Sequence, residues 1–463
     1  MIKIVLLFLI SNIYGQQIDF TVGSYKNQSI LFQSTNNVPL DLDKSLLSNI
    51  YIQYPNKSKK IEFISNIFTD GEDIDIYEMG IKLNFINNLI EIGKIKEEDN
   101  ELFLVNNHIV FNNKHEPIER ITIRSKKFTT LPFWKNNNFF KKVSLSYNFT
   151  NGLLDEDYMY EWDEYYGEES RTVFYSKSPR IHIKNLFVKY SINNQSNFTL
   201  GFNHAAIWGG TVENLYNNTT KKYSNSLKNL HKVIFWQEGG SEYDRNEVTG
   251  GVIGNHLGSI DFIFEKKIKD SKMTILYQHI FEDVRSFRFV REGGNKFDGL
   301  WAINFTNNLA NSRIKQFTIE FLNTKYQSGN IHPTGVDSYF WHDQYPVGWQ
   351  YKGLSMGSMF MSPSNNRMKL YFLSSEIYIS NRFTLKYNIG NGNIYNYYGW
   401  KSWNEPISNY IEEDFKGKYS GILLTLNQKI DGDFILEYHL GSEKNIDLKN
   451  QSFGIKITKL LKL

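Results

Sequence analysis

The sequence predicts an all-β protein, a transmembrane antiparallel β-barrel of about 18 strands. Three observations predict this fold: an apolar N-terminal segment typical of exported proteins, period-2 alternation along the whole chain, and connections of two different lengths. A strand of ~10 residues and an average connection of ~14 residues give about 18 strands in the ~448 residues after that segment. A barrel of this size is wide enough to hold a polar lumen.

Residues 1–15 have the pattern of a secretory signal peptide. Lys3 supplies a positive charge, Ile4 to Ile10 form an apolar stretch, and Gly15 is a small residue at a suitable cleavage point. We therefore expect residues 16–463 to form one exported domain, an outer-membrane β-barrel. A buried N-terminal strand is the alternative interpretation of the same residues.

The composition excludes several classes of protein. The chain has no cysteine, which excludes disulfides, thiolate metal sites and a lipoprotein anchor. Its formal net charge of +3 is small for 463 residues and argues against a nucleic-acid partner. The aromatic fraction, 16%, is high, and exported β-proteins place aromatic side chains at membrane interfaces and on sugar-binding surfaces.

Alternation gives each predicted strand one apolar face and one polar face. It occurs in five segments: 143–149, 197–203, 316–321, 383–389 and 434–440. In the third of these the apolar and polar residues are Phe317, Ile319 and Phe321 against Gln316, Thr318 and Glu320. A soluble sandwich also alternates, but the pattern here recurs without a helical interlude. We therefore expect the apolar faces to contact lipid and the polar faces to line a lumen.

The connections favour the same fold. Tight turns are expected at Ser380-Asn381 and Asp431-Gly432, and long, irregular, aromatic loops near 150–178, 209–230, 284–298, 327–350 and 390–420. Short turns on one rim and long loops on the other are typical of outer-membrane barrels, with the loops outside the cell. Residues 36–50 are compatible with one short helix capped by Asp41 or Asp43.

The segment 151–170 holds eight carboxylates and five aromatic rings. Rings stack on sugar faces and carboxylates accept hydrogen bonds from hydroxyls, which makes this segment the first candidate for polysaccharide binding. A solvated acidic loop is the plainer interpretation, calcium-loop spacing is missing, and a glycosidase carboxylate pair is not specified. The binding candidates are Tyr158, Tyr160, Trp162, Asp163, Glu164 and Tyr165, with Trp341 and Trp349 from a later segment.

Five blocks in order carry a resemblance to a known family. They are HIKNLFVKY (182–190), GFNHAAIWGG (201–210), GNHLGSIDF (254–262), YQHIFED (277–283) with FDGLW (297–301), and WHDQYPVGWQYKG (341–353). Together they resemble the capsule assembly Wzi family over about residues 180–360. The resemblance implies an outer-membrane barrel of about 18 strands that holds capsular or exopolysaccharide at the cell surface. In some members it also implies a small helical element on the periplasmic side, to which the short helix of 36–50 would correspond. It gives motif positions of unknown role: His204, Trp208, Asn255, His256, Asp298, Trp301 and His342.

The expected function is therefore non-enzymatic binding of polysaccharide in the outer membrane. We expect outer-membrane lipid as a second partner and no metal, cofactor or catalytic residues, because no nucleophile elbow, zinc-binding helix or phosphate loop occurs. A porin-type channel or polysaccharide export pore is the first alternative, and a surface enzyme is the second. The bulky residues Trp208, Trp301, Trp341 and Trp349 favour a blocked lumen.

Overall fold

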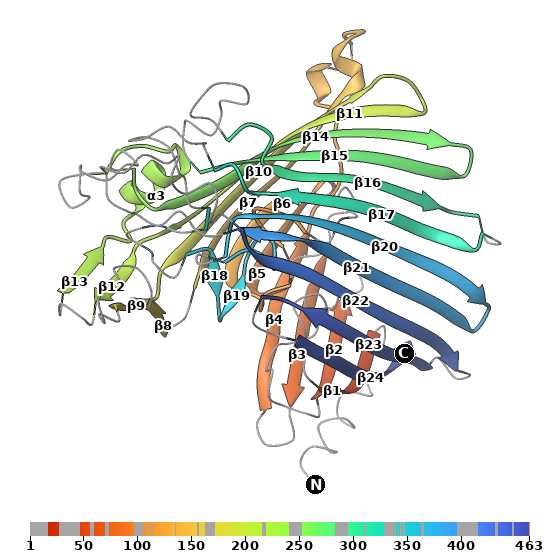
Figure 1. Cartoon of the computed structure of the whole chain (residues 1–463). Helices are drawn as coiled ribbons and strands as arrows, with labels where there is room; N and C mark the ends of the chain where they lie inside the picture. The colour runs from red at the N-terminus through yellow and green to blue at the C-terminus, as the bar shows by residue number, and fades with distance from the viewer. Residues whose placement is uncertain are drawn as a thin grey trace.

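The structure is a computed structural model of the whole chain (Figure 1). It describes the following residues: 17–26, 47–55, 60–69, 74–96, 105, 107–112, 114–134, 136–154, 157–162, 172–214, 219–239, 252–282, 295–309, 312–327, 339–340, 342, 345, 348–362, 365–395, 415–430, 434–446 and 449–462. The predicted signal peptide therefore lies outside the described residues.

An antiparallel sheet of 18 strands forms the body of the molecule (Figure 1). The strands pair in chain order, and β1 (Gln17–Lys26) pairs with both β2 (Leu47–Pro55) and β24 (Lys449–Lys462). The hydrogen-bonded order thus returns to the strand from which it starts. The expectation of an all-β, antiparallel fold is confirmed.

The other strands of this sheet have the following bounds: β3 (Ile61–Thr69), β4 (Ile74–Asn84), β5 (Asn88–Lys94), β6 (Glu119–Ser125), β7 (Val143–Leu153), β10 (Arg180–Ser191), β11 (Ser196–Trp208), β14 (Asn255–Ile268), β15 (Ser271–Phe281), β16 (Gly299–Asn307), β17 (Ile314–Asn323), β20 (Met368–Ser380), β21 (Phe383–Tyr395), β22 (Phe415–Ile430) and β23 (Phe434–Lys444).

The two rims of the sheet carry different connections. On one rim, β20 and β21 are joined at the predicted Ser380-Asn381 turn, and β22 and β23 pair up to Ile430 and Phe434. The predicted Asp431-Gly432 turn between these two residues lies outside the described residues. The start of β1 and the end of β24 lie on the same rim, since Gln17 pairs with Lys462. We call this the short-turn rim and the opposite one the loop rim.

The loop rim is more regular than the sequence suggests. Within the expected irregular loops, four short strands form a second sheet in the order β13-β12-β9-β8. Their bounds are β8 (Asp157–Trp162), β9 (Thr172–Lys177), β12 (Gly210–Asn214) and β13 (Thr219–Tyr223), and the helix α3 (Leu227–Ile234) follows. The expected helix in 36–50 is wrong for residues 47–50, which belong to β2; Asp41 and Asp43 lie outside the described residues.

The polarity of the sheet faces is the reverse of that in a soluble sandwich. The outward side chains of Ile303 and Ile319 are 47% and 44% exposed, whereas the inward Thr318 and Glu320 are buried. The alternation predicted for 316–321 therefore has the predicted facing. An apolar exterior around a polar interior is the pattern of a membrane barrel.

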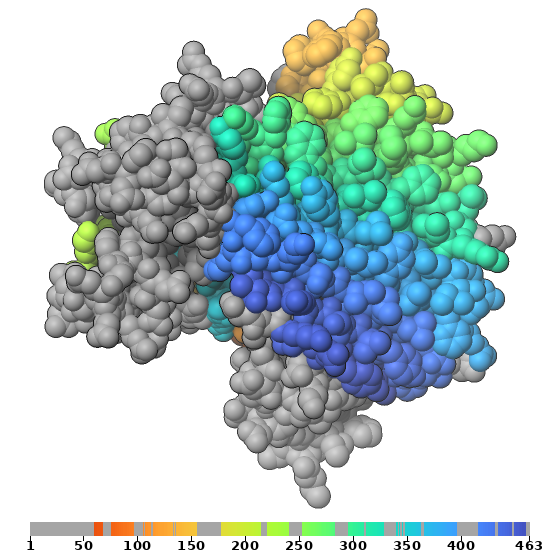
Figure 2. All heavy atoms as spheres, in the orientation of Figure 1, coloured from red at the N-terminus to blue at the C-terminus, as the bar shows by residue number. Residues whose placement is uncertain are grey.

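The strand register aligns outward side chains into two rows. Direct partners on six successive strands form an aliphatic row of Ile275, Ile303, Ile319, Leu373, Ile389 and Ile422. On the strands from β14 to β20, an aromatic row lies two residues nearer the loop rim: Phe262, Tyr277, Trp301, Phe321 and Tyr371. Rings at the edge of an aliphatic band are typical of a membrane interface. In Figure 2 the strands β14 to β23 form one continuous wall.

None of the helices among the described residues has the length and apolar character needed to span a membrane.

The first prediction tests whether the outer wall meets lipid. Ile319→Arg, in the middle of β17, should destabilise the protein in vesicles by about 2–4 kcal/mol. The control is Ile268→Arg at the rim end of β14, where the side chain is equally exposed at 45% and the cost should be about 0–1 kcal/mol. Denaturant unfolding in vesicles measures both. Equal, small effects would mean that water rather than lipid surrounds the wall.

Candidate functional site

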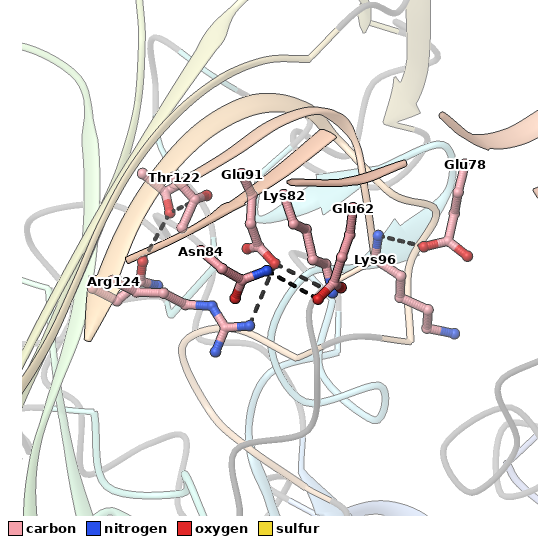
Figure 3. Close-up of polar contacts among 10 residues, drawn as sticks. Glu62, Glu78, Lys82, Asn84, Glu91, Lys96, Thr122 and Arg124 are labelled. Carbon is pink, nitrogen blue, oxygen red and sulfur yellow. Dashed lines mark hydrogen bonds and ion pairs between the residues drawn. The ribbon is translucent and has the colours of Figure 1, made fainter. Parts of the chain in front are cut away.

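Ion pairs line the interior on β3 to β7 (Figure 3). Glu62, Lys82, Glu91, Thr122 and Thr150 are register partners on five successive strands. The Lys82 Nζ lies 3.5 Å from the Glu91 carboxylate, and the two threonine hydroxyls lie 2.8 Å apart. Because Glu91 is buried, its charge depends on these neighbours for compensation.

Neighbouring side chains extend this row toward the short-turn rim. The Arg124 guanidinium lies 3.3 Å from the Glu91 carboxylate, and the Asn84 amide donates to Glu62 over 2.9 Å (Figure 3). Glu91 therefore receives two cations from the strands on either side of it. The row holds opposite charges side by side, so it fixes strand register as well as the polarity of the interior.

Further inward ion pairs continue around the sheet. Glu265 on β14 lies 3.2 Å from the Lys189 Nζ and 3.4 Å from the Lys272 Nζ. Two more inward pairs are Glu376 with Lys386 at 3.6 Å and Glu437 with Lys456 at 2.9 Å. We call these pairs, with those of Glu91, the ion-pair belt.

A segment between β5 and β6 crosses the interior. The Asn107 side-chain amide donates to the Glu320 carboxylate of β17 over 2.6 Å. Six strands (β7, β10, β11, β14, β15 and β16) separate β17 from β6 around the sheet. Val105 packs on inward side chains of those intervening strands, including Phe187 and Ile263. Residues 105 and 107–112 therefore cross the lumen, and we call them the plug.

The plug meets a second infolded segment, residues 348–362. The Trp349 Nε1 donates to the Val110 carbonyl over 2.6 Å, and the backbone N–H of Asn112 donates to the Met356 carbonyl over 2.7 Å. A Cβ on Gly357 would collide with the Ile109 carbonyl oxygen, so only glycine permits this approach. Two loop-rim segments thus pack against each other within the sheet.

An apolar core surrounds the contact between the two segments. Its infolded members include Ile109, Tyr339, Phe340, Tyr345, Trp349, Met356 and Phe360, and its wall members include Leu300, Leu322, Leu370, Phe372 and Leu423. Trp349 is 0% exposed, so it offers no ring to solvent and is corrected here from a sugar-binding candidate to a core residue. Trp341 lies outside the described residues.

Asp298 ties three loop-rim segments together. Its carboxylate accepts hydrogen bonds from the backbone N–H of Tyr326 and Gln327 at 3.1 and 2.7 Å, and from the Tyr339 hydroxyl at 3.1 Å. Burial raises the pKa of Asp298 to about 7, although these hydrogen bonds act to lower it. The motif residue His342 is also buried, which lowers its pKa to about 4 and keeps it neutral at pH 7.

His204 and His256 form a buried pair on the outer face of β11 and β14. The His256 Nε2 donates to the Ile253 carbonyl over 2.7 Å, so its Nδ1 accepts from the His204 Nε2 over 2.8 Å. Trp236, which follows α3, packs on both rings with centroid separations of 5.4 and 5.6 Å. The Lys184 side chain donates to the Ile234 carbonyl. The pair therefore anchors α3 to the wall.

The remaining motif residues have separate environments. Trp208 and Asn255 are buried at the loop ends of β11 and β14, with the Arg180 guanidinium 5.9 Å from the Trp208 ring. Trp301 stacks on Tyr277 with ring centroids 3.9 Å apart and is 37% exposed on the outer wall. The expectation that Trp301 helps to block the lumen is therefore wrong, since it points away from it.

The acidic segment is described only in part. Tyr158, Tyr160 and Trp162 lie on β8, at the edge of the second sheet and paired with β9. Asp163, Glu164 and Tyr165 lie outside the described residues. The structure thus places three of the binding candidates on one strand of the loop rim.

Sequence reasoning missed both the plug and the ion-pair belt as features. The plug is a short segment without periodicity, and its contact with Glu320 joins residues 213 positions apart. Lys82, Glu91 and Arg124 look like any polar strand residues until register brings them together. Only their alternation with apolar neighbours could have indicated that they face the lumen.

Comparisons with known proteins show the fold. The structure is similar to Wzi from Escherichia coli, an outer-membrane protein involved in group 1 capsule assembly and a carbohydrate-binding β-barrel. The TM-score is 0.59 at 12% identity, over 100% of this chain and 88% of Wzi. Lower similarity is found to OccK5 (OpdH) of Pseudomonas aeruginosa, with a TM-score of 0.47 at 7% identity over 97% and 98% of the two chains. No family model and no curated protein matches the sequence. The predicted resemblance thus holds at the level of an outer-membrane β-barrel fold.

The second prediction concerns the packing of Trp349 in the interior. Trp349→Ala should destabilise the protein by about 3–5 kcal/mol and raise its conductance in planar bilayers, because it removes a core ring and the bond to Val110. Trp301→Ala removes the same atoms from the outer wall and should leave conductance unchanged. If the two variants conduct equally, Trp349 does not hold the plug.

The third prediction concerns pH. Because the folded pKa of Asp298, about 7, exceeds its ordinary value of 3.8, the folded state binds this proton more tightly. The stabilisation is complete below pH 4 and is lost as pH rises to 7, by about 1.4 kcal/mol per unit at most. Asp298→Asn should flatten this dependence in thermal unfolding between pH 4 and 8. Asp270→Asn, at an exposed turn on the other rim, should preserve it; a profile unchanged by Asp298→Asn would contradict the assignment.

Proposed function

We propose that the protein is a closed outer-membrane β-barrel that binds capsular or exopolysaccharide and holds it at the cell surface without chemical change. Residues 1–15 would direct export, the loop rim would face outside, and the short-turn rim would face the periplasm. The apolar outer wall supports the membrane placement. The shared fold with a carbohydrate-binding barrel supports the ligand class.

The packing of two infolded segments inside the sheet is the observation that carries this proposal. A diffusion channel needs a continuous aqueous path, whereas here the plug crosses the interior and an apolar core surrounds it. Among the described residues, buried tyrosine, tryptophan and methionine side chains fill the interior at this level and offer polar solutes little hydrated lining. A barrel whose interior is filled near the loop rim can still bind polysaccharide on the outer surface of that rim.

The porin alternative has one observation in its favour. The ion-pair belt gives the half of the interior near the short-turn rim a charged lining, as in a channel. Its charges are paired between neighbouring strands, so the belt holds the strands in register without an open path. Near-zero conductance of the wild-type protein would favour polysaccharide binding; stable porin-like conductance would favour the channel.

The proposed sugar contact is the acidic aromatic segment on the loop rim. Tyr158, Tyr160, Trp162 and Tyr165 would stack on sugar rings, and Asp163 and Glu164 would accept hydrogen bonds from hydroxyls. β8 places the first three on a strand of the second sheet, which gives the segment an ordered base. Trp341, from a later segment of the sequence, is a further candidate.

The fourth prediction tests retention in cells. Deleting the gene should leave polymer synthesis intact and raise the amount of polymer shed into the medium. Replacing Trp162 and Tyr165 together by Ala should reproduce this loss, because ring stacking depends on apolar area. Asp163→Asn with Glu164→Gln should matter less unless a cation bridges the carboxylates, in which case a chelator should mimic it.

Trp301→Ala is the matched control, since it removes an exposed ring from the outer wall. Normal retention in the deletion strain, with altered uptake of small solutes, would contradict the proposed function and support the porin.

A further inference from the structure

The connection between β6 and β7, on the short-turn rim, is much longer than a tight turn and contains two short 3₁₀ helices. Residues 126–142, described except for residue 135, join β6 to β7 and project above the strands in Figure 1 and Figure 2. We call them the foot. The foot is ordered by Asn137, whose side-chain oxygen accepts hydrogen bonds from the Phe139 and Phe140 N–H groups at 2.9 and 3.1 Å. It therefore presents its side chains from a fixed turn.

Aromatic rings connect the foot to the outer wall. Trp134 stacks on Phe140 at 5.5 Å, Phe140 meets Phe139 edge-on at 5.4 Å, and Phe139 stacks on Tyr190 at 5.3 Å. Tyr190 shares the outward face of β10 with the exposed Leu186. Phe139 and Phe140 are nevertheless 58% and 41% exposed. The rings thus stand beside the apolar wall, at its edge on the short-turn rim.

The foot is also strongly basic. Residues 120–154 contain no Asp or Glu, and the foot itself carries Lys126, Lys127, Lys135, Lys141 and Lys142. The four of these lysines that the structure describes are exposed, and no salt bridge joins them to a described residue. Lys142 Nζ lies 6.0 Å from the Tyr190 ring, so positive charge and aromatic rings occupy the same edge.

We propose that the foot binds anionic phospholipid headgroups of the periplasmic leaflet. Aromatic rings favour the depth of the headgroups, and lysines beside them attract phosphate. The rings continue the lipid-facing wall of β10, which favours lipid over a soluble protein partner. Polysaccharide would meet the opposite rim. This inference rests on the proposed membrane placement, which Ile319→Arg tests separately.

The absence of cysteine makes a direct test simple. Asn138→Cys places one environment-sensitive label on an exposed residue of the foot. The full-length protein is placed in nanodiscs of phosphatidylcholine alone or with phosphatidylglycerol added. We expect the label to move to a less polar environment when the anionic lipid is present, and about 0.5 M salt to reverse the shift.

Charge variants in the same labelled background identify the cause. Lys141→Gln with Lys142→Gln should strongly weaken the response, because the loss of two lysines near an anionic surface lowers the affinity about 30-fold. Lys221→Gln with Lys222→Gln makes the same charge change on exposed residues of β13 at the loop rim and should leave the response intact. Polysaccharide retention should be normal in both variants, which separates this test from that of the proposed function.

Several outcomes would overturn the inference. One is a label that does not distinguish the two lipid compositions in the wild-type background. Another is an equal loss of response in both lysine pairs. A label that stays in water within nanodiscs but cross-links to another envelope protein in cells would assign the foot to a protein partner instead.

Discussion

Every backbone N–H and C=O group that faces hydrocarbon must find its partner within the sheet, because lipid offers none. The pairing of β1 with β24 and of each strand with its neighbours meets this requirement without leaving an edge. Because the sheet returns to its first strand, each strand side chain points either outward or into the interior. Apart from the His204–His256 pair beneath α3, the outward direction is mainly aliphatic and aromatic, and the inward direction holds the ion-pair belt and much of the apolar core. Facing, register and the content of the interior all follow from this closure.

The interior is divided into two zones with different physical chemistry. Near the short-turn rim, Glu91, Glu265 and Glu437 are each held by cations from neighbouring strands, which compensates buried charge. Toward the loop rim, Trp349 and its neighbours form a core that resembles that of a soluble domain. Asp298 joins the segments that form this core. The barrel wall thus acts as a scaffold for a small apolar assembly that would otherwise have no surface against which to fold.

Sequence predicted the wall well because alternation is a local signal. The facing of Ile319 and Thr318 and the turn at Ser380-Asn381 follow from neighbouring residues alone. The site was harder to predict, because it depends on contacts between residues far apart in the sequence. Asn107 bonds to Glu320 across the lumen, and Trp349 bonds to Val110 at a similar separation in sequence. No periodic pattern marks such contacts. Trp301 and Trp349 look equivalent in sequence, yet register places one on the outer wall and infolding places the other in the core.

The junction of β1 with β24 also has a kinetic consequence. Gln17 pairs with Lys462, so the last seam forms between segments at opposite ends of the described chain. Contacts of such high sequence separation carry a large loop-closure entropy and form late. Until then both strands expose unpaired edges, which attract other chains. A chain that lacked β24 would keep an unpaired edge on β1 even after the other strands had paired, and this edge could associate with other chains.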